Sequence, residues 1–195
     1  MPASELAGEV DMEMILHTER LVLQPADPSK AGQLLDYMLR NQAFLREWDP
    51  ARTPDFYTVE TQRDLIEGDL LQMESGQLSK FWVYKREEPG RTIGTIALSN
   101  IVRGAFQSCH LGYRLDQEEV NKGFMTESLA RVIRYAFDEL RLHRIEANIM
   151  PRNAASLKVV EKLGFQSEGL ARKYLKINGK WEDHIHMVLL NEAME

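Results

Sequence analysis

The sequence is poor in cysteine and in long apolar runs. Its single cysteine, Cys109, has no partner within the chain for a disulfide, which fits a reducing compartment such as the cytoplasm. A membrane-spanning helix needs about 18 or more apolar residues, whereas the longest promising uncharged stretch runs only from Thr92 to Val102. The acidic N-terminus lacks the apolar core of a secretory signal. We therefore expect a cytoplasmic protein with no membrane partner.

Positive charge is also in short supply. The 24 Lys and Arg residues are outnumbered by 30 Asp and Glu residues, which gives a formal net charge of −6. Proteins that bind nucleic acid through its phosphates need a basic surface, so we expect no direct contact with nucleic acid. A length of 195 residues, with 44% hydrophobic and 28% charged residues, is typical of one globular domain.

The first half of the chain divides into a short tail and the start of a domain. Residues 1–14 are acidic with few apolar anchors, which predicts a loose tail and leaves a single domain over 15–191. A strand is predicted at 19–25, helices at 29–40 and 59–74, and a compact aromatic turn at 44–50 between these helices.

The second half alternates strands and helices. A strong amphipathic helix follows Gly123, another is capped by Asn153, and Asn178-Gly179 favours a type I′ turn within a hairpin. The order predicts an α+β fold (α/β in some schemes) with a mixed, twisted sheet of about seven strands flanked by about four helices. The strands predicted in this half lie at 81–84, 92–98, 109–115, 145–149, 165–177 and 180–190.

Residues 115–127 form the most informative segment. They comprise a strand end, a loop with the single glycine Gly123, and the start of the strong helix. Unpaired N–H groups and the positive end of the helix dipole suit such a helix start to an anion, and glycine lets the backbone approach a phosphate closely. The same pattern also occurs as an ordinary turn. Gly-x-Gly-x-x-Gly and Gly-Lys-Ser/Thr sequences are absent, so dinucleotide- and NTP-binding fingerprints are excluded.

The arrangement of this loop with a later helix resembles the GNAT acyltransferase superfamily. About forty residues after Gly123, an Asn153-capped helix ends in Leu163-Gly164-Phe165. The segments 18–21, 44–50, 99–104 and 178–183 make the chain similar to RimJ/RimL-type ribosomal-protein-alanine N-acetyltransferases, nearer the RimJ type. The resemblance covers roughly residues 16 to 190 and implies the GNAT fold.

The resemblance implies acetyl-CoA as cosubstrate and direct acetyl transfer to an amine. Backbone amides of 120–126 would hold the pyrophosphate, and the strand around Gly112 and Tyr113 would splay from 145–149. Asn153 would bond the pantetheine arm and Ser156 would lie near the sulfur. The implied cofactor-binding residues are Leu115, Val120, Asn121, Lys122, Gly123, Phe124, Met125, Thr126, Asn153 and Ser156.

The sequence departs from the family pattern at the loop and at the catalytic positions. Val120 and Asn121 replace the usual loop residues, and Met125 stands where the family has a small residue. Val160 occupies the place of a tyrosine acid, which leaves Ser156 as the candidate acid. Asn148 occupies the place of a glutamate base. The candidate bases are Glu47, Asp49, Glu146 and Asp183, with Glu47 and Asp49 expected to be catalytic.

The implied acceptor is the N-terminal amine of a peptide or protein, including a ribosomal protein. Two alternatives stay open: an acetyltransferase for a small amine such as a polyamine or aminoglycoside, and a non-catalytic module that binds acyl-CoA. His184 and His186 share a strand face but lack a matched third ligand, so no metal is expected. The chain is expected to be a monomer or a homodimer.

Overall fold

The computed structural model describes residues 14–194. Residues 1–13 of the acidic tail predicted over 1–14 therefore lie outside the described residues. Within 14–194, no helix is long and apolar enough to cross a membrane.

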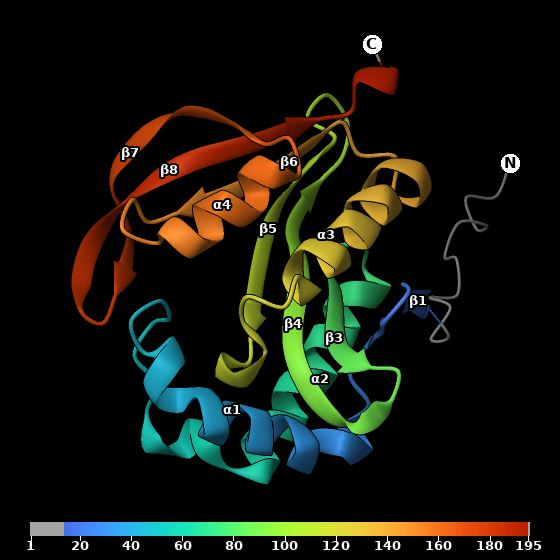
Figure 1. The fold of residues 1–195 in the computed structure, drawn as a ribbon, viewed down its shortest axis with the longest axis vertical. Coiled ribbons are helices and arrows are strands. Elements are labelled where there is room, and N and C mark those ends of the chain that lie inside the picture. The colour runs from blue at the N-terminus through green and yellow to red at the C-terminus, as the bar shows by residue number, and fades with distance from the viewer. Residues whose placement is uncertain (1–13, 195) are drawn as a thin grey trace, which may run out of the picture.

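A mixed sheet of eight strands forms the centre of the fold (Figure 1). The spatial order is β1-β2-β3-β4-β5-β6-β8-β7, and among the strands of residues 14–194 only the pair β5 and β6 is parallel. This confirms the predicted mixed sheet, with the two-residue β1 as the strand beyond the predicted seven. The strands are β1 (Leu16–His17), β2 (Leu21–Gln24), β3 (Ser79–Lys85), β4 (Glu88–Val102), β5 (Ser108–Leu115), β6 (Arg144–Ile149), β7 (Gln166–Ile177) and β8 (Lys180–Leu190).

In the described part of the chain, four α-helices cover the two faces of the sheet. They are α1 (Ala31–Leu45), α2 (Val59–Glu74), α3 (Phe124–Arg134) and α4 (Ala154–Lys162). Alternate residues of a strand point to opposite faces. On β3, Phe81 and Val83 belong to the core cluster under α3 and α4, whereas Trp82 and Tyr84 pack with α1 and α2. One helix pair therefore lies on each face.

Helix α1 is longer than predicted. It runs to Leu45, so Phe44 and Leu45 belong to the helix, and the predicted aromatic turn at 44–50 begins two residues too early. Tertiary packing explains the extension, because Leu45 is buried in the same core cluster as Tyr37.

The local features of the second half are confirmed. The helix after Gly123 buries Leu129 and Val132 completely, and the Asn153 side chain accepts a hydrogen bond from Ser156 N–H at 3.1 Å. Asn178 and Gly179 both have positive φ, 48° and 81°, as a type I′ turn between β7 and β8 requires.

Strands β5 and β6 separate partway along their length. They pair only between Ser108–His110 and Arg144–Glu146. Beyond that point β5 continues to Leu115 along β4, while β6 continues to Ile149 along β8. The predicted splay of these strands is confirmed, and we call the region beyond His110 and Glu146, where β5 and β6 no longer pair, the opening.

Candidate active site

Two helices begin beside the opening between β5 and β6. Because these strands are parallel, their carboxyl ends lie at the same edge of the sheet. Strand β5 leads through residues 116–123 into α3, and β6 leads through residues 150–153 into α4. Both helix N-termini therefore border the opening, at the kind of crevice where open α/β sheets bind ligands.

The loop before α3 presents its backbone. Asn121 and Gly123 have positive φ, 62° and 82°, and asparagine adopts this conformation more readily than most residues. The departure at Asn121 therefore suits the loop. Phe124 and Met125 are buried, so both side chains pack into the core. Gly123 provides no side-chain cap, which leaves the N–H groups of the first turn available to an anion.

Arg20 clamps this loop from the β1–β2 turn. Its Nε donates to Glu127 Oε2 at 2.7 Å and its Nη1 donates to the Lys122 carbonyl at 3.1 Å, while the guanidinium lies 4.4 Å from the centre of the Phe124 ring. Burial by itself would raise the pKa of Glu127, but hydrogen bonds from Thr18 and Arg20 outweigh burial and lower it. From the sequence, residues 18–21 supported only the resemblance to the family, and the contacts of Arg20 with Glu127 and Lys122 were not predicted.

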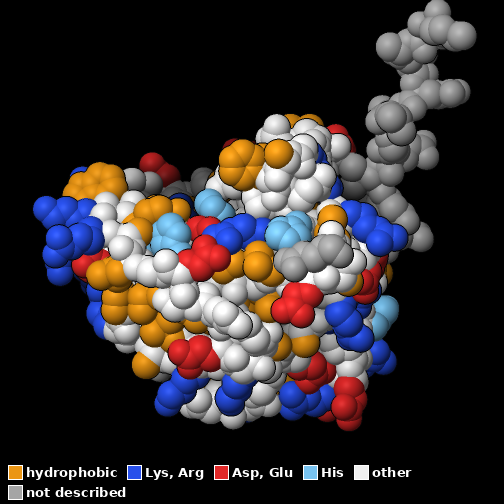
Figure 2. Space-filling model, turned by 90° about the horizontal axis from the view of Figure 1, so that it is seen from above, with side chains coloured by type: hydrophobic (Ala, Val, Ile, Leu, Met, Phe, Trp, Pro, Cys, Tyr) orange, Lys and Arg blue, Asp and Glu red, His pale blue; other side chains and the backbone are white. Residues whose placement is uncertain are grey.

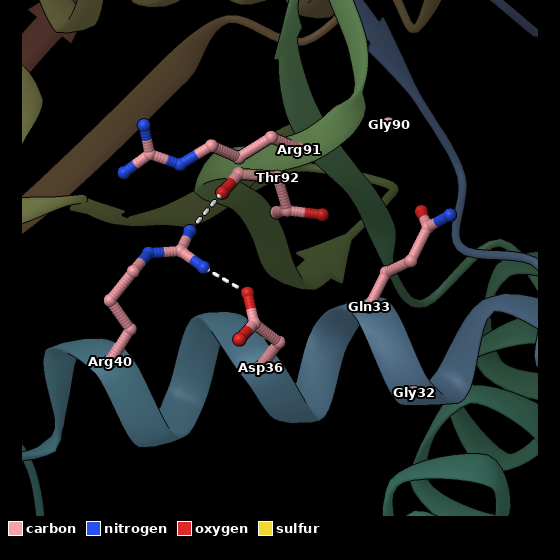
Figure 3. A pocket seen from close by; sticks show the side chains of 7 residues that line it. All are labelled: Gly32, Gln33, Asp36, Arg40, Gly90, Arg91 and Thr92. Atoms are coloured by element: carbon pink, nitrogen blue, oxygen red, sulfur yellow. Dashed lines mark hydrogen bonds and ion pairs between the residues drawn. The ribbon is translucent and has the colours of Figure 1, made fainter.

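Asp116 anchors the start of the loop from inside the protein. Its side chain is fully buried and lies 2.9 Å from Arg40 and 3.2 Å from Arg91. Figure 3 shows both arginines in a pocket between α1 and β4, where Arg40 also donates to the Thr92 carbonyl at 2.7 Å. Burial would raise the pKa of Asp116, but the Glu118 N–H and the two arginines hold it below its usual value.

Lys122 is engaged within the loop. Its Nζ lies 2.9 Å from Glu119, which is buried and also pairs with Lys85 at 3.1 Å. Burial favours the neutral form of Glu119, but these lysines outweigh it and lower the pKa of the carboxyl. The side chain of Lys122 therefore stabilises the loop from the protein side, and half of it stays exposed to solvent.

At the start of α4, two hydroxyl groups meet. Ser156 Oγ lies 2.6 Å from the hydroxyl of Tyr113, and this phenol also donates to the Ser156 carbonyl at 3.1 Å. Tyr113 lies on the part of β5 that has separated from β6. Burial raises the pKa of the phenol to about 12. Val160, which stands where the family has a tyrosine, is fully buried. The tyrosine hydroxyl beside Ser156 is instead that of Tyr113. Sequence reasoning placed Tyr113 at the splay but gave its hydroxyl no role.

The turn after α1 faces the tip of the β7–β8 hairpin (Figure 1). Asn178 donates to the Arg46 carbonyl. Asp49 pairs with Arg114 of β5 at 2.7 Å, and Glu47 lies 3.5 Å from Arg152, which follows β6. Residues 46–49 thus contact Arg114, Arg152 and Asn178, which are far away in sequence, and we call this surface next to the opening the wall. Glu47 and Asp49 lie on this wall, and each is paired with an arginine.

The other candidate bases are also engaged. Glu146 lies 3.0 Å from Arg144 and 3.1 Å from His186 Nδ1; burial would raise its pKa, but these partners lower it. Asp183 accepts a hydrogen bond from Lys173 N–H at 2.8 Å. Because its pKa is lowered, the Glu146 carboxylate is a weak base. Over residues 14–194, no three His, Cys, Asp or Glu side chains are grouped to hold a metal ion.

Comparison with known proteins finds relatives that are acetyltransferases. A family model for the acetyltransferase (GNAT) domain matches residues 20–166. The chain is 41% identical over 177 residues to a probable N-acetyltransferase, YjcK, of Bacillus subtilis (strain 168), covering 91% of this chain and 97% of the relative.

Two solved structures share the architecture. The ribosomal-protein-S5-alanine acetyltransferase of Vibrio fischeri superposes with a TM-score of 0.88 at 35% identity, over 94% of this chain and 100% of that one. RimJ of Mycobacterium smegmatis, in complex with CoA-disulfide, superposes with a TM-score of 0.83 at 26% identity, over 89% and 83% of the two chains. With a family model that spans most of its length and these relatives, the chain belongs to the GNAT acetyltransferase family.

Proposed function

We propose that this acetyltransferase transfers an acetyl group from acetyl-CoA to the N-terminal amine of a protein, with a ribosomal protein as the favoured acceptor. The observation that carries the proposal is the opening between β5 and β6, bordered by the N-termini of α3 and α4. The Vibrio fischeri relative, named for acetylation of an alanine of ribosomal protein S5, supports the acceptor. Such an acceptor places the reaction in the cytoplasm.

The loop before α3 suits the pyrophosphate of the coenzyme. Its positive-φ residues expose backbone, and the first turn of α3 supplies N–H donors with no acceptor inside the helix. Residues 120–126 would contribute through backbone N–H groups, which is why side-chain changes such as Val120 are compatible with binding. The complex of the Mycobacterium smegmatis relative with CoA-disulfide supports a coenzyme A compound as the ligand of this chain.

The opening suits direct transfer between two bound substrates. Acetyl-CoA supplies the acetyl group as a thioester. The separated edge of β5 at 111–115 has backbone groups that are not bonded to β6, and an N–H group there would stabilise the negative charge that develops on the carbonyl oxygen. Asn153 would position the pantetheine arm and Ser156 would face the sulfur. Holding amine and thioester in one opening supplies the proximity that the reaction needs.

The acceptor amine needs little help from a base. An α-amino group has a reference pKa of about 7.7–8.0, so about 9–17% of it is already neutral at pH 7, against about 0.04% for a lysine at about 10.4. We propose Glu47 and Asp49 as the carboxylates nearest the incoming amine, on the wall beside the opening. Figure 2 shows basic and acidic side chains interspersed on the face it displays, so long-range attraction of the acceptor is modest.

A thiol-release assay with matched acceptors tests this function. The acceptors are a peptide with a free N-terminal alanine, the same peptide with its N-terminus blocked but with an internal lysine, and spermidine. We expect release of CoA with the first and nearly none with the second. Faster release with spermidine would favour the small-amine acetyltransferase, and binding of acetyl-CoA without release for any acceptor would favour the non-catalytic module.

A further inference from the structure

The hydroxyl of Tyr113 has two hydrogen-bond acceptors, and both belong to Ser156. They are Ser156 Oγ at 2.6 Å and the Ser156 carbonyl oxygen at 3.1 Å. A phenol carries one proton, so it donates to one of these acceptors at a time. Rotation of the two O–H bonds, of Tyr113 and of Ser156, therefore switches between two hydrogen-bonding arrangements without movement of a heavy atom.

The two arrangements leave Ser156 with different capacities. When the phenol donates to the carbonyl, the short contact is made by the Ser156 O–H donating to the phenol oxygen, and Ser156 has no proton for another partner. When the phenol donates to Ser156 Oγ, the serine proton is free to donate elsewhere. The second arrangement turns Ser156 into a hydrogen-bond donor toward the opening.

We propose that Tyr113 is a positioning residue that directs the Ser156 hydroxyl proton toward the leaving sulfur. The inference rests on the proposed function, since it takes a CoA thioester as the substrate at this site. Tyr113 reaches Ser156 from β5, and Asn153 fixes the backbone of Ser156 from the α4 N-cap. The hydroxyl pair is thus held from both sides of the opening.

In this step both hydroxyl groups keep their protons. As the C–N bond forms and the C–S bond breaks, the electron pair of the C–S bond passes to sulfur, and the amine nitrogen loses its proton to solvent. The Ser156 O–H donates a hydrogen bond to the resulting thiolate, which takes a proton from solvent after release. Transfer of the Tyr113 proton to sulfur is unfavourable because burial raises the pKa of the phenol to about 12, well above about 8.5 for a thiol.

A binding experiment tests the proposal without any acceptor. CoA and desulfo-CoA, which has hydrogen in place of the thiol, are titrated into the protein at pH 7 and pH 9 by calorimetry. A hydrogen bond to the thiolate lowers the pKa of the thiol of bound CoA. If the free thiol has the cysteine reference pKa of about 8.5, a lowering of one unit raises the ratio of the CoA affinity to the desulfo-CoA affinity about sixfold from pH 7 to pH 9. We expect this rise in the wild type and less than twofold in Tyr113→Phe and Ser156→Ala.

Tyr135→Phe is the matched control, because Tyr135 is a second buried phenol beside a serine, 3.5 Å from Ser79 Oγ, away from the opening. It should keep the wild-type rise. A pH-independent ratio in the wild type, or an undiminished rise in Tyr113→Phe, would overturn the role of Tyr113. If the wild type did not bind CoA at all, both the proposed function and the role of Tyr113 would be overturned.

Turnover supplies a second, independent criterion. If Tyr113 acts through Ser156, Tyr113→Phe lowers kcat about tenfold in the wild-type background and has no further effect in Ser156→Ala, with the Kd for acetyl-CoA unchanged in all variants. Equal losses in both backgrounds would show that Tyr113 acts independently of Ser156 and would refute the proposal.

Discussion

Replacement of Gly123 by aspartate is expected to weaken acetyl-CoA binding at least tenfold. Gly123 precedes α3 with φ of +82°, at the point where the loop would meet the pyrophosphate. The substitution adds a side chain to the exposed backbone, and it places a negative charge next to the two negative phosphates of the bound coenzyme. It leaves the buried residues Phe124 and Met125 in place.

The substitution affects stability and affinity separately. A non-glycine residue in the left-handed region costs about 1–2 kcal/mol of folding stability whether or not coenzyme is bound. The loss of affinity comes from repulsion between the new carboxylate and a phosphate about 5 Å away, which is about 0.8 kcal/mol at a dielectric constant of 80 and about 3 kcal/mol at 20. The added Cβ would lie 3.4 Å from Arg20, an ordinary contact with a flexible side chain. The repulsion alone is comparable to the 1.4 kcal/mol that corresponds to a tenfold change in Kd.

Calorimetric titration of acetyl-CoA, with thermal unfolding in parallel, measures the effect. Gly76→Asp is the matched control, because Gly76 also has positive φ, +70°, and an added Cβ there meets nothing within 4 Å. It should lose similar stability and keep the affinity. A folded Gly123→Asp variant that binds acetyl-CoA as tightly as the wild type would refute the assignment of this loop to the coenzyme.

Three further predictions concern residues around the opening. Asp116→Asn should lower the free energy of unfolding by about 3 kcal/mol at pH 7, because it removes a buried partner of two arginines. Since the pKa of Asp116 is lowered in the folded state, the difference in unfolding free energy between wild type and variant should persist above about pH 4 and narrow as the pH falls below it. A difference that stays constant with pH in urea unfolding would contradict this. Glu127→Gln should weaken acetyl-CoA binding about fivefold in calorimetry by loosening the Arg20 clamp, and unchanged affinity would separate the clamp from binding. Cys109, whose burial raises its pKa to about 12, should react with Ellman's reagent at pH 8 only after unfolding, and rapid labelling of the folded protein would contradict its burial.

The sequence predicted the features that depend on neighbouring residues. Asn153 caps α4 by accepting a hydrogen bond from the N–H of Ser156, three residues later, and Asn178-Gly179 forms its turn within the hairpin, so local conformational preference suffices for both. The end of α1 was missed because Leu45 continues the helix for a tertiary reason, its burial against residues far away in sequence.

The contacts that complete the site are long-range and could not be read from spacing. Arg20 and Glu127 are 107 residues apart, and Tyr113 and Ser156 are 43 residues apart. Each pair depends on the order of strands in the sheet, which brings β2 near the start of α3 and the separated end of β5 near the start of α4. The type of site was therefore predictable, but its anchoring contacts were not.

A competition assay tests whether this chain transfers the acetyl group of acetyl-CoA to a protein N-terminus. The enzyme is given limiting acetyl-CoA with equal concentrations of spermidine and of a peptide that has a free N-terminal alanine and an internal lysine, and the products are located by mass spectrometry. The proposed function predicts acetyl groups predominantly on the α-amine of the peptide, because that amine is the most neutral at pH 7 and the opening lies beside an extended wall. Acetylation mainly of spermidine or of the lysine side chain would contradict it.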